Sequence, residues 1–233
     1  MDPVVRVADL RKQYVLGATT VNALDGVDLT IEPGEFLAIM GPSGSGKSTF
    51  MQIVGLLDTP TSGSYFFDGI DVLATTADER AALRSRRLGF VFQSYNLLPR
   101  TSALENVELP MIYAGVEETG RNRVAMEMMA LVGVDHLAHH HSNQMSGGQQ
   151  QRIAIARSLV NHPALILADE PTGALDTKSS AEVMRIFSHL NETQGSTIML
   201  VTHEPDIAAY ARRIVTFRDG RILSDVANER RAA

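Results

Sequence analysis

The sequence contains no cysteine, and this absence excludes two kinds of chemistry. Without thiols the chain can form neither disulfide bonds nor thiolate metal sites. His139, His140 and His141 are the nearest thing to a metal-binding cluster. They are adjacent in a loop-like stretch, and no carboxylate stands at the spacing that a zinc site uses. We interpret them as a solvated loop.

Long hydrophobic runs are also missing. No segment approaches the roughly 18 to 20 apolar residues that a bilayer-spanning helix needs. The first ten residues, MDPVVRVADL, lack a basic region followed by an apolar stretch, so we expect no signal peptide. Any membrane role is therefore expected to depend on a partner.

A basic face is the third missing feature. The 233 residues carry a net charge of −6, with acidic and basic side chains interspersed, so we expect no nucleic-acid partner. The densest basic cluster is Arg84, Arg86 and Arg87, which we interpret as a solvated helix face. With 44% hydrophobic and 21% charged residues, the composition is that of an ordinary globular domain.

Short apolar runs alternate with helical patterns along the chain. Early strands are predicted at Val4–Val7 and Val27–Ile31, with a turn around Gly17. Four later apolar runs have the pattern of strands buried on both faces of a sheet, at 36–40, 89–92, 165–168 and 197–201. A helix is predicted at 47–57. Asp219-Gly220, between two further apolar runs, predicts a hairpin. This order predicts an α/β core with a largely parallel sheet.

Residues 102–141 differ in composition and pattern from the rest of the chain. They are rich in Leu, Met, Ala and Glu and contain no convincing strand. We predict a single domain over residues 1–233. Its α/β core comprises residues 1–101 and 142–233, and residues 102–141, with the start of the following helix, form an inserted helical subdomain.

The stretch GPSGSGKST, from Gly41 to Thr49, satisfies the pattern G-x-x-x-x-G-K-[ST] between a strand and a helix. Its glycines let several backbone N–H groups point at phosphates, Lys47 can reach the β- and γ-phosphates, and Ser48 can place its hydroxyl on Mg²⁺. We predict nucleotide binding by Gly41, Pro42, Ser43, Gly44, Ser45, Gly46, Lys47, Ser48 and Thr49.

LILADE, residues 165–170, supplies the complementary half of a phosphate-transfer site. A buried strand that ends in a carboxylate places Asp169 where it can hold Mg²⁺. Glu170 follows and can deprotonate an attacking water as general base.

A second glycine motif, MSGGQQQR at residues 145–152, also precedes a helix and suits anion binding. Together GPSGSGKST, MSGGQ and LILADEP resemble the nucleotide-binding subunit of ABC transporters. The stretches GFVFQSYNLLPRTSALENVELP and QMSGGQQQRIAIARSLVNHP are similar to the lipoprotein-release, macrolide-export and cell-division ATPases of that family. The likeness extends from about Val4 to Val226.

The resemblance implies a P-loop NTPase of ABC type, with a RecA-like mixed sheet core, an antiparallel β part at the N-terminus and an inserted helical subdomain. It implies further site residues that the local pattern alone would not select. Tyr14 would stack on adenine, Gln93 would touch Mg²⁺ and the attacking water, and His203 would contact the γ-phosphate. Asp176 would lie in the loop between two ATP sites. In that loop Gly173 replaces the serine usual in the wider family, and we read no loss of function from it.

The resemblance also implies the assembly. ATP and Mg²⁺ would be the ligands, and a second copy would cover the ATP with Ser146, Gly147, Gly148 and Gln149. The dimer would drive export or extraction through separate transmembrane permease subunits, on the cytoplasmic face of the cell membrane. The principal alternative is an ATP-driven regulatory module of a cell-envelope or division complex that moves no substrate. An ATPase acting on DNA or ribosomes fits less well, and a kinase or GTPase would leave MSGGQ unexplained.

Overall fold

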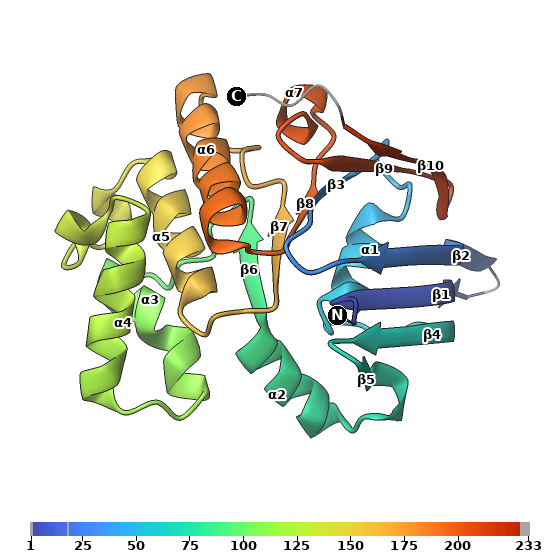
Figure 1. The fold of residues 1–233 in the computed structure, drawn as a ribbon, viewed down its shortest axis with the longest axis horizontal. Coiled ribbons are helices and arrows are strands. Elements are labelled where there is room, and N and C mark those ends of the chain that lie inside the picture. Colours follow the sequence, from blue (N-terminus) through green and yellow to red (C-terminus); the bar gives the residue numbers. More distant parts are fainter. Residues whose placement is uncertain (1, 18, 229–233) are drawn as a thin grey trace.

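The structure, a computed structural model, describes residues 2–17 and 19–228. Two sheets organise the chain, and helices pack around them (Figure 1). The N-terminal sheet is antiparallel. Its strands run in the order β2 (Thr19–Ile31), β1 (Val5–Leu16), β4 (Ser62–Phe67) and β5 (Ile70–Asp71).

The core sheet is mixed, as predicted. Its described strands run in the order β10 (Arg221–Ala227), β9 (Arg213–Arg218), β3 (Phe36–Met40), β8 (Ile198–Val201), β7 (Leu165–Asp169) and β6 (Leu88–Phe92). Strands β9, β3, β8, β7 and β6 are parallel, and β10 pairs with β9 as an antiparallel hairpin. Asp219 and Gly220 form its turn with positive φ at both residues, which confirms the predicted hairpin.

The helices follow the strands in chain order. They are α1 (Lys47–Val54), α2 (Ala77–Arg87), α3 (Ala103–Tyr113), α4 (Glu118–Leu131), α5 (Gly147–Leu159), α6 (Thr177–Gln194) and α7 (Pro205–Ala208). Short 3₁₀ turns lie at η1 (Val72–Ala74), η2 (Asp135–Leu137) and η3 (Ser142–Gln144). Residues 102–141 contain α3, α4 and η2 and no strand, and a bridge between Ser102 and His141 joins the two ends of this segment.

Two hydrophobic clusters lie on opposite faces of the core sheet. Alternate residues of β3 point to opposite sides, so Leu37 and Ile39 join one cluster while Phe36 and Ala38 join the other. The first cluster contains α1 and the N-terminal sheet, and the second contains α3, α5 and α6. Helices α1 and α5 are thus separated by the core sheet.

Three predicted boundaries were wrong: one helix end and two strand ends. The helix expected over residues 47–57 ends at Val54, because Gly55 packs closely on Phe90 and Leu56 adopts a left-handed backbone with φ 57°. The first two strands are much longer than predicted, and they continue to Leu16 and from Thr19. Register shifts in β1, near Asp9 with its φ of 45°, break the alternation that would have revealed the strand.

Candidate functional site

Several of the predicted site residues lie at one edge of the core sheet. Strands β3, β8, β7 and β6 are adjacent and parallel, so their carboxyl ends lie together. The residues that follow these ends are the phosphate-loop glycine Gly41, His203, Glu170 and Gln93, respectively. In parallel α/β sheets this edge is where ligands bind.

The glycine loop has a backbone that only glycine permits at two positions. Gly41 has φ 146°, and a Cβ there would collide with the carbonyl oxygen of Phe217. Gly46 has φ 105°, and a Cβ there would lie 2.6 Å from the carbonyl oxygen of Ala23. The loop also contains one unpaired polar group among the described residues, since the hydroxyl of Ser45 is buried without a hydrogen-bond partner.

Lys47 lies inside this loop. Its Nζ donates to the carbonyl oxygens of Gly41 at 2.7 Å and Pro42 at 2.9 Å, and the side chain is buried. An ammonium has three N–H donors, so one remains for an anion. No acidic residue occupies the first turn of α1, which leaves the positive end of the helix dipole unneutralised. This arrangement of donors and helix dipole suits a phosphate group.

One carboxylate ends β7 and a second follows it. Burial, reinforced by the neighbouring charge of Glu170, raises the pKa of Asp169, and Lys47 partly offsets this effect. Glu170 has a left-handed backbone with φ 43°, and its N–H donates to the carbonyl oxygen of Val201 at 2.9 Å. The turn therefore directs consecutive carboxyl groups to one edge of the sheet.

Glu170 is paired with a side chain from the next strand. Its Oε1 lies 2.9 Å from Nδ1 of His203, which follows β8 and is 60% exposed. The carboxylate is 27% exposed, so water can reach it. A carboxylate that is both oriented and open to water has the geometry of a general base.

Gln93 lies against the loop that follows Glu170. A Cβ at Gly173 would stand 2.7 Å from Nε2 of Gln93, so the glycine leaves room for this amide. This is a structural reason for Gly173 where the wider family has serine. Asp176, further along the same loop, caps α6 by accepting hydrogen bonds from the N–H and the hydroxyl of Ser179, which lower the pKa of the carboxyl group. The structure thus brings Gln93 and this loop together.

The second glycine motif forms the start of α5. Ser146 is its N-cap: Oγ accepts from the N–H of Gln149 at 3.3 Å, and Oε1 of Gln149 accepts from the N–H of Ser146 at 2.8 Å. Such a capping box leaves other N–H groups of the first turn available to a ligand. Because α5 and α1 pack on opposite faces of the core sheet, this motif does not belong to the chain's own glycine loop.

Tyr14 lies on β1, and its hydroxyl donates to Oδ2 of Asp58 at 2.9 Å. Asp58, and the Lys12 that contacts it, belong to none of the motifs recognised in the sequence. Only the short spacing of Lys12 and Tyr14 on one strand could have hinted at their association. His139, His140 and His141 are exposed, and the described residues contain no group of three or more His, Asp or Glu side chains suited to a metal.

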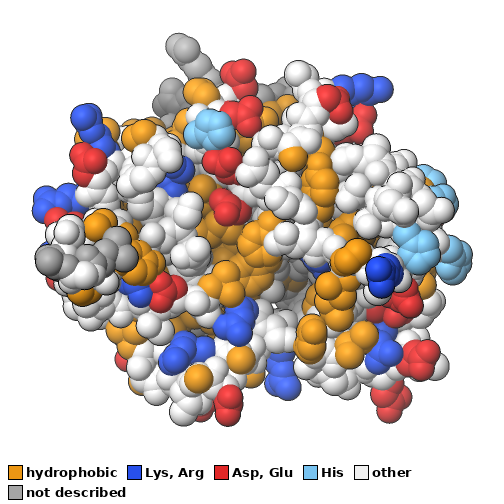
Figure 2. All heavy atoms as spheres, turned by 180° about the vertical axis from the view of Figure 1, so that it is seen from behind, with side chains coloured by type: hydrophobic (Ala, Val, Ile, Leu, Met, Phe, Trp, Pro, Cys, Tyr) orange, Lys and Arg blue, Asp and Glu red, His pale blue; other side chains and the backbone are white. Residues whose placement is uncertain are grey.

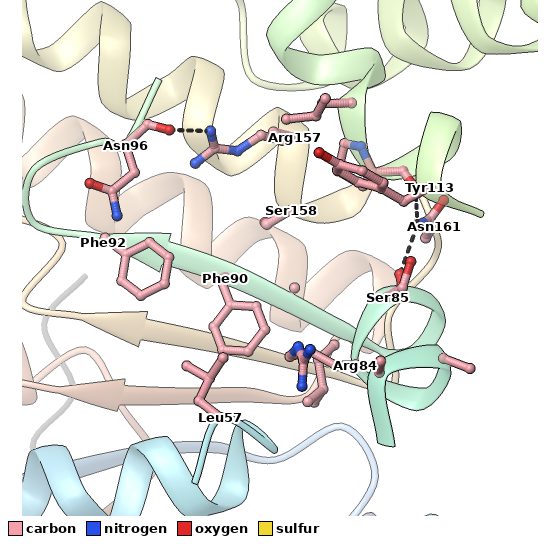
Figure 3. A pocket seen from close by; sticks show the side chains of 16 residues that line it. Leu57, Arg84, Ser85, Phe90, Phe92, Asn96, Tyr113, Arg157, Ser158 and Asn161 are labelled. Atoms are coloured by element: carbon pink, nitrogen blue, oxygen red, sulfur yellow. Dashed lines mark hydrogen bonds between the residues drawn. The ribbon is translucent and has the colours of Figure 1, made fainter. Parts of the chain in front are cut away.

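A groove of about 720 Å³ opens beside the site. It lies between α2 and β6 on one side and α3 and α5 on the other, and Phe90, Phe92 and Tyr113 supply much of its apolar wall (Figure 3). Figure 2 shows hydrophobic side chains around a hollow in the middle of this face, above a band of basic side chains. Arg84, predicted to be part of a solvated helix face, lines the groove and donates to the carbonyl oxygen of Leu56.

Arg157 connects the groove to the loop after Gln93. Its guanidinium donates to the carbonyl oxygens of Tyr95 at 2.9 Å and Asn96 at 2.6 Å, both of which have positive φ (Figure 3). Burial lowers the pKa of this guanidinium. Arg157 could not be recognised from the sequence, because its partners lie about 60 residues away.

No helix within residues 2–17 and 19–228 combines the length and apolar character that crossing a bilayer demands.

Comparison with known proteins agrees with this geometry. The family described as ABC transporter matches residues 24–173. A macrolide export ATP-binding/permease protein, MacB, of Syntrophobacter fumaroxidans is 54% identical over 94% of this chain, which spans 31% of that relative's length. An uncharacterised ABC transporter ATP-binding protein of Bacillus subtilis, YknY, is 51% identical over 97% of this chain and 98% of its own length.

A solved structure is similar over nearly the whole fold. It is described as the dimeric, post-hydrolysis state of the ATP-binding cassette MJ0796 bound to ADP and Pi. The TM-score is 0.88 and the identity 42%, covering 97% of this chain and 99% of that one.

Proposed function

The chain belongs to the ABC transporter family and is an ATP-binding cassette ATPase, and from this premise we propose that it drives export or extraction of a substrate through separate membrane subunits. The observation that carries the proposal is the convergence of the glycine loop, Glu170, His203 and Gln93 at one edge of the core sheet. We also propose that residues 1–233 form one domain, with residues 102–141 as its helical subdomain.

In the proposed reaction the glycine loop holds the triphosphate. Lys47 donates its remaining N–H to a phosphate oxygen. Glu170 orients and deprotonates the attacking water, while His203 contacts the γ-phosphate and holds the carboxylate through their hydrogen bond. Positioning and charge stabilisation supply most of the catalysis in phosphoryl transfer.

A Mg²⁺ ion fits the groups present. The hydroxyl of Ser48, the amide oxygen of Gln93 and the carboxylate of Asp169 are oxygen ligands, which Mg²⁺ prefers. The raised pKa of Asp169, caused by burial and by the charge of Glu170, indicates a carboxylate that a nearby cation would stabilise in its ionised form. Bound there, the cation would neutralise charge on the phosphates.

A second copy of the chain completes the proposed ATP site. Ser146, Gly147, Gly148 and Gln149 begin a helix on the opposite face of the core sheet from the glycine loop. This position supports a role in covering the ATP of a neighbouring copy and not the chain's own. The related cassette with ADP and Pi is dimeric, which supports this arrangement. ATP then stabilises the closed pair, and phosphate loss allows it to open.

The groove beside Gln93 is the proposed docking site for a membrane subunit, which would place the cassette on the cytoplasmic face of the membrane. Its apolar wall suits a short helix, and Tyr113 is 75% exposed at its edge. A partner in the groove would touch Arg157, which holds the loop after Gln93. Closure of the ATP site could thus be transmitted to the membrane.

The absence of native cysteine makes this proposal directly testable. A Tyr113→Cys variant carries the only thiol in the chain. It is expressed in the source organism, and membranes from these cells are treated with a thiol crosslinker. The expected result is one crosslinked membrane protein, identified by mass spectrometry as a permease. Val15→Cys is the control, because Val15 is similarly exposed at 73% but lies in the hairpin of β1 and β2, away from the groove.

Substrate movement is then measured with the crosslinked partner. Vesicles that contain the complex should accumulate or release a substrate only with hydrolysable ATP. A complex that hydrolyses ATP and binds its partner, but moves nothing, would instead establish the regulatory alternative. Equal crosslinking at residues 113 and 15 would reject the groove as the docking site.

A further inference from the structure

Asp58 is the centre of a compact polar cluster beside Tyr14. Its Oδ2 accepts from the hydroxyl of Tyr14 at 2.9 Å, and its Oδ1 accepts from Nζ of Lys12 at 2.7 Å and from the N–H of Thr59 at 2.7 Å. Lys12 also donates to the carbonyl oxygen of Thr59 at 2.8 Å. Both carboxylate oxygens are thus used, and Tyr14 is held at its outer end.

The Tyr14 ring is also restrained on one face. Nζ of Lys12 lies over the ring, 5.0 Å from its centroid, and the Lys12 side chain is only 12% exposed. The ammonium therefore contacts both the ring and the carboxylate that binds the ring's hydroxyl. A base that stacks on Tyr14 would therefore use the opposite face.

The charge on Asp58 strengthens this arrangement. Partial burial alone would favour the neutral acid, but the hydrogen bonds from Lys12, Thr59 and Tyr14 lower the pKa of Asp58 below its usual value. A hydroxyl that donates to an ionised carboxylate forms a stronger hydrogen bond than one that donates to a neutral group. The ring is consequently fixed by a charge-assisted contact.

Asp58 also connects the ring to the phosphate loop. The N–H groups of Leu57 and Asp58 donate to the carbonyl oxygen of Gln52 in α1, at 2.8 Å and 3.2 Å. Helix α1 begins at Lys47, within the glycine loop, and the side chain of Thr49 in its first turn also interacts with the Tyr14 hydroxyl. Through Asp58, Tyr14 is therefore connected to the helix that carries the phosphate site.

We propose that Asp58, supported by Lys12, is a positioning residue that fixes Tyr14 as a platform for the adenine base at a set distance from the phosphate loop. The inference deepens the proposed function and rests on the stacking role of Tyr14. A nucleotide must contact the platform and the loop at once. A preformed distance between them avoids the cost of ordering the ring during binding.

The test compares a ligand with a base and a ligand without one. ATP and inorganic tripolyphosphate are titrated into the full chain by calorimetry, for the parent and for Asp58→Ala, Tyr14→Phe, the double variant and Tyr14→Ala. Glu127→Ala is the matched control, because it also removes a carboxylate from an ion pair, on α4. Melting temperatures show that each variant folds.

Asp58→Ala and Tyr14→Phe should each weaken ATP binding by about fivefold to twentyfold, within the range of base-stacking contributions, and change tripolyphosphate binding by less than about twofold. The double variant should lose no more ATP affinity than the weaker-binding of the two single variants, because both changes remove the same hydrogen bond. In hydrolysis assays KM for ATP should rise while kcat stays within about twofold.

Three outcomes would overturn the proposal. The first is an equal loss of affinity for ATP and for tripolyphosphate. The second is a loss of ATP affinity in the double variant that equals the product of the two single losses. The third is an unchanged ATP affinity in Asp58→Ala. Tyr14→Ala separates this failure from a failure of the proposed function. If Tyr14→Ala weakens ATP binding and Asp58→Ala does not, only the positioning role is rejected. If Tyr14→Ala has no effect, the stacking role itself is rejected.

Discussion

Glu170 and His203 follow neighbouring parallel strands, and Oε1 of the glutamate lies 2.9 Å from Nδ1 of the histidine. The two residues are 33 positions apart in the sequence, so the contact depends on the register of β7 and β8. The left-handed backbone of Glu170 directs its side chain toward the histidine. The orientation of the proposed general base is thus set by the sheet.

Glu170→Gln should abolish steady-state hydrolysis and retain ATP binding. The amide preserves the shape of the side chain but cannot accept a proton, and the loss of a general base slows turnover by about 100-fold or more. Phosphate release measures the rate, and gel filtration with ATP should reveal an accumulated dimer. Glu127→Gln, at an exposed ion pair on α4, should behave as the parent. Turnover at the parent rate in Glu170→Gln would refute the assignment.

Lys47→Ala should weaken nucleotide binding itself. The buried ammonium is the charged donor inside the glycine loop, and its removal leaves phosphate charge and two backbone carbonyls uncompensated. We expect an ATP affinity lower by about tenfold or more in calorimetry. Lys178→Ala, at an exposed position in the first turn of α6, is the control and should bind ATP normally. An unchanged affinity in Lys47→Ala would reject the clamp.

Ser146→Asp should impair hydrolysis far more than first binding of ATP. Asparagine and aspartate both cap helices as well as serine, so Ser146→Asn serves as a control that preserves the start of α5. Only the aspartate adds a charge that repels the phosphates of a neighbouring copy. We expect its hydrolysis rate to fall about tenfold or more below that of Ser146→Asn, with ATP affinity within about twofold.

Dimer formation provides the second measurement for Ser146. Combined with Glu170→Gln, the aspartate variant should remain monomeric with ATP in gel filtration, while the asparagine variant should dimerise. Equal dimer formation by the two variants would place Ser146 outside the shared site.

Asp169→Asn should stabilise the nucleotide-free protein at neutral pH and eliminate hydrolysis. Burial and the charge of Glu170 raise the pKa of Asp169, so the folded chain holds this proton to a higher pH than the unfolded chain does. Above the folded pKa the ionised group opposes folding. Without Mg²⁺ we expect the melting temperature of Asp169→Asn to exceed that of the parent by about 2 °C or more at pH 7.5.

The pH dependence identifies the cause of this stabilisation. As the pH falls through the folded pKa, the parent becomes protonated and loses the penalty, so the difference in melting temperature should shrink. Below the unfolded pKa both states of the parent are neutral, and the electrostatic advantage should be gone. Asp135→Asn, at an exposed aspartate in η2, is the control. A difference independent of pH would contradict the electrostatic explanation.

Local sequence patterns are sufficient to predict the segments that carry the phosphate-binding motifs. Strand β3, the glycine loop and the start of α1 were predicted because a buried run, a glycine motif and a helical pattern follow one another directly. Strand β7 was predicted for the same reason, and the resemblance to ABC transporter cassettes supplied Tyr14, Gln93 and His203.

Contacts between distant segments could not be predicted in this way. The hydrogen bond from Tyr14 to Asp58 spans 44 positions, and Asp58 follows a helix in an otherwise unremarkable turn. The hydrogen bond from Arg157 to the carbonyl oxygen of Asn96 spans 61 positions, and it depends on two residues with positive φ that their identities do not suggest. Such partners become visible only when the sheets and helices are assembled.

Helix α5 has one end at Ser146 and carries Arg157 near the other, and its 13 residues make it about 20 Å long. The proposed contact with a neighbour's nucleotide and the proposed contact with a membrane partner therefore act on one rigid element. Coupling between two binding sites is reciprocal. A partner that tightens ATP binding through α5 must itself be bound more tightly when ATP is present, by the same factor. Each turnover would then strengthen and weaken partner binding as well as nucleotide binding. The factor by which the partner changes ATP affinity would equal the factor by which ATP changes partner affinity.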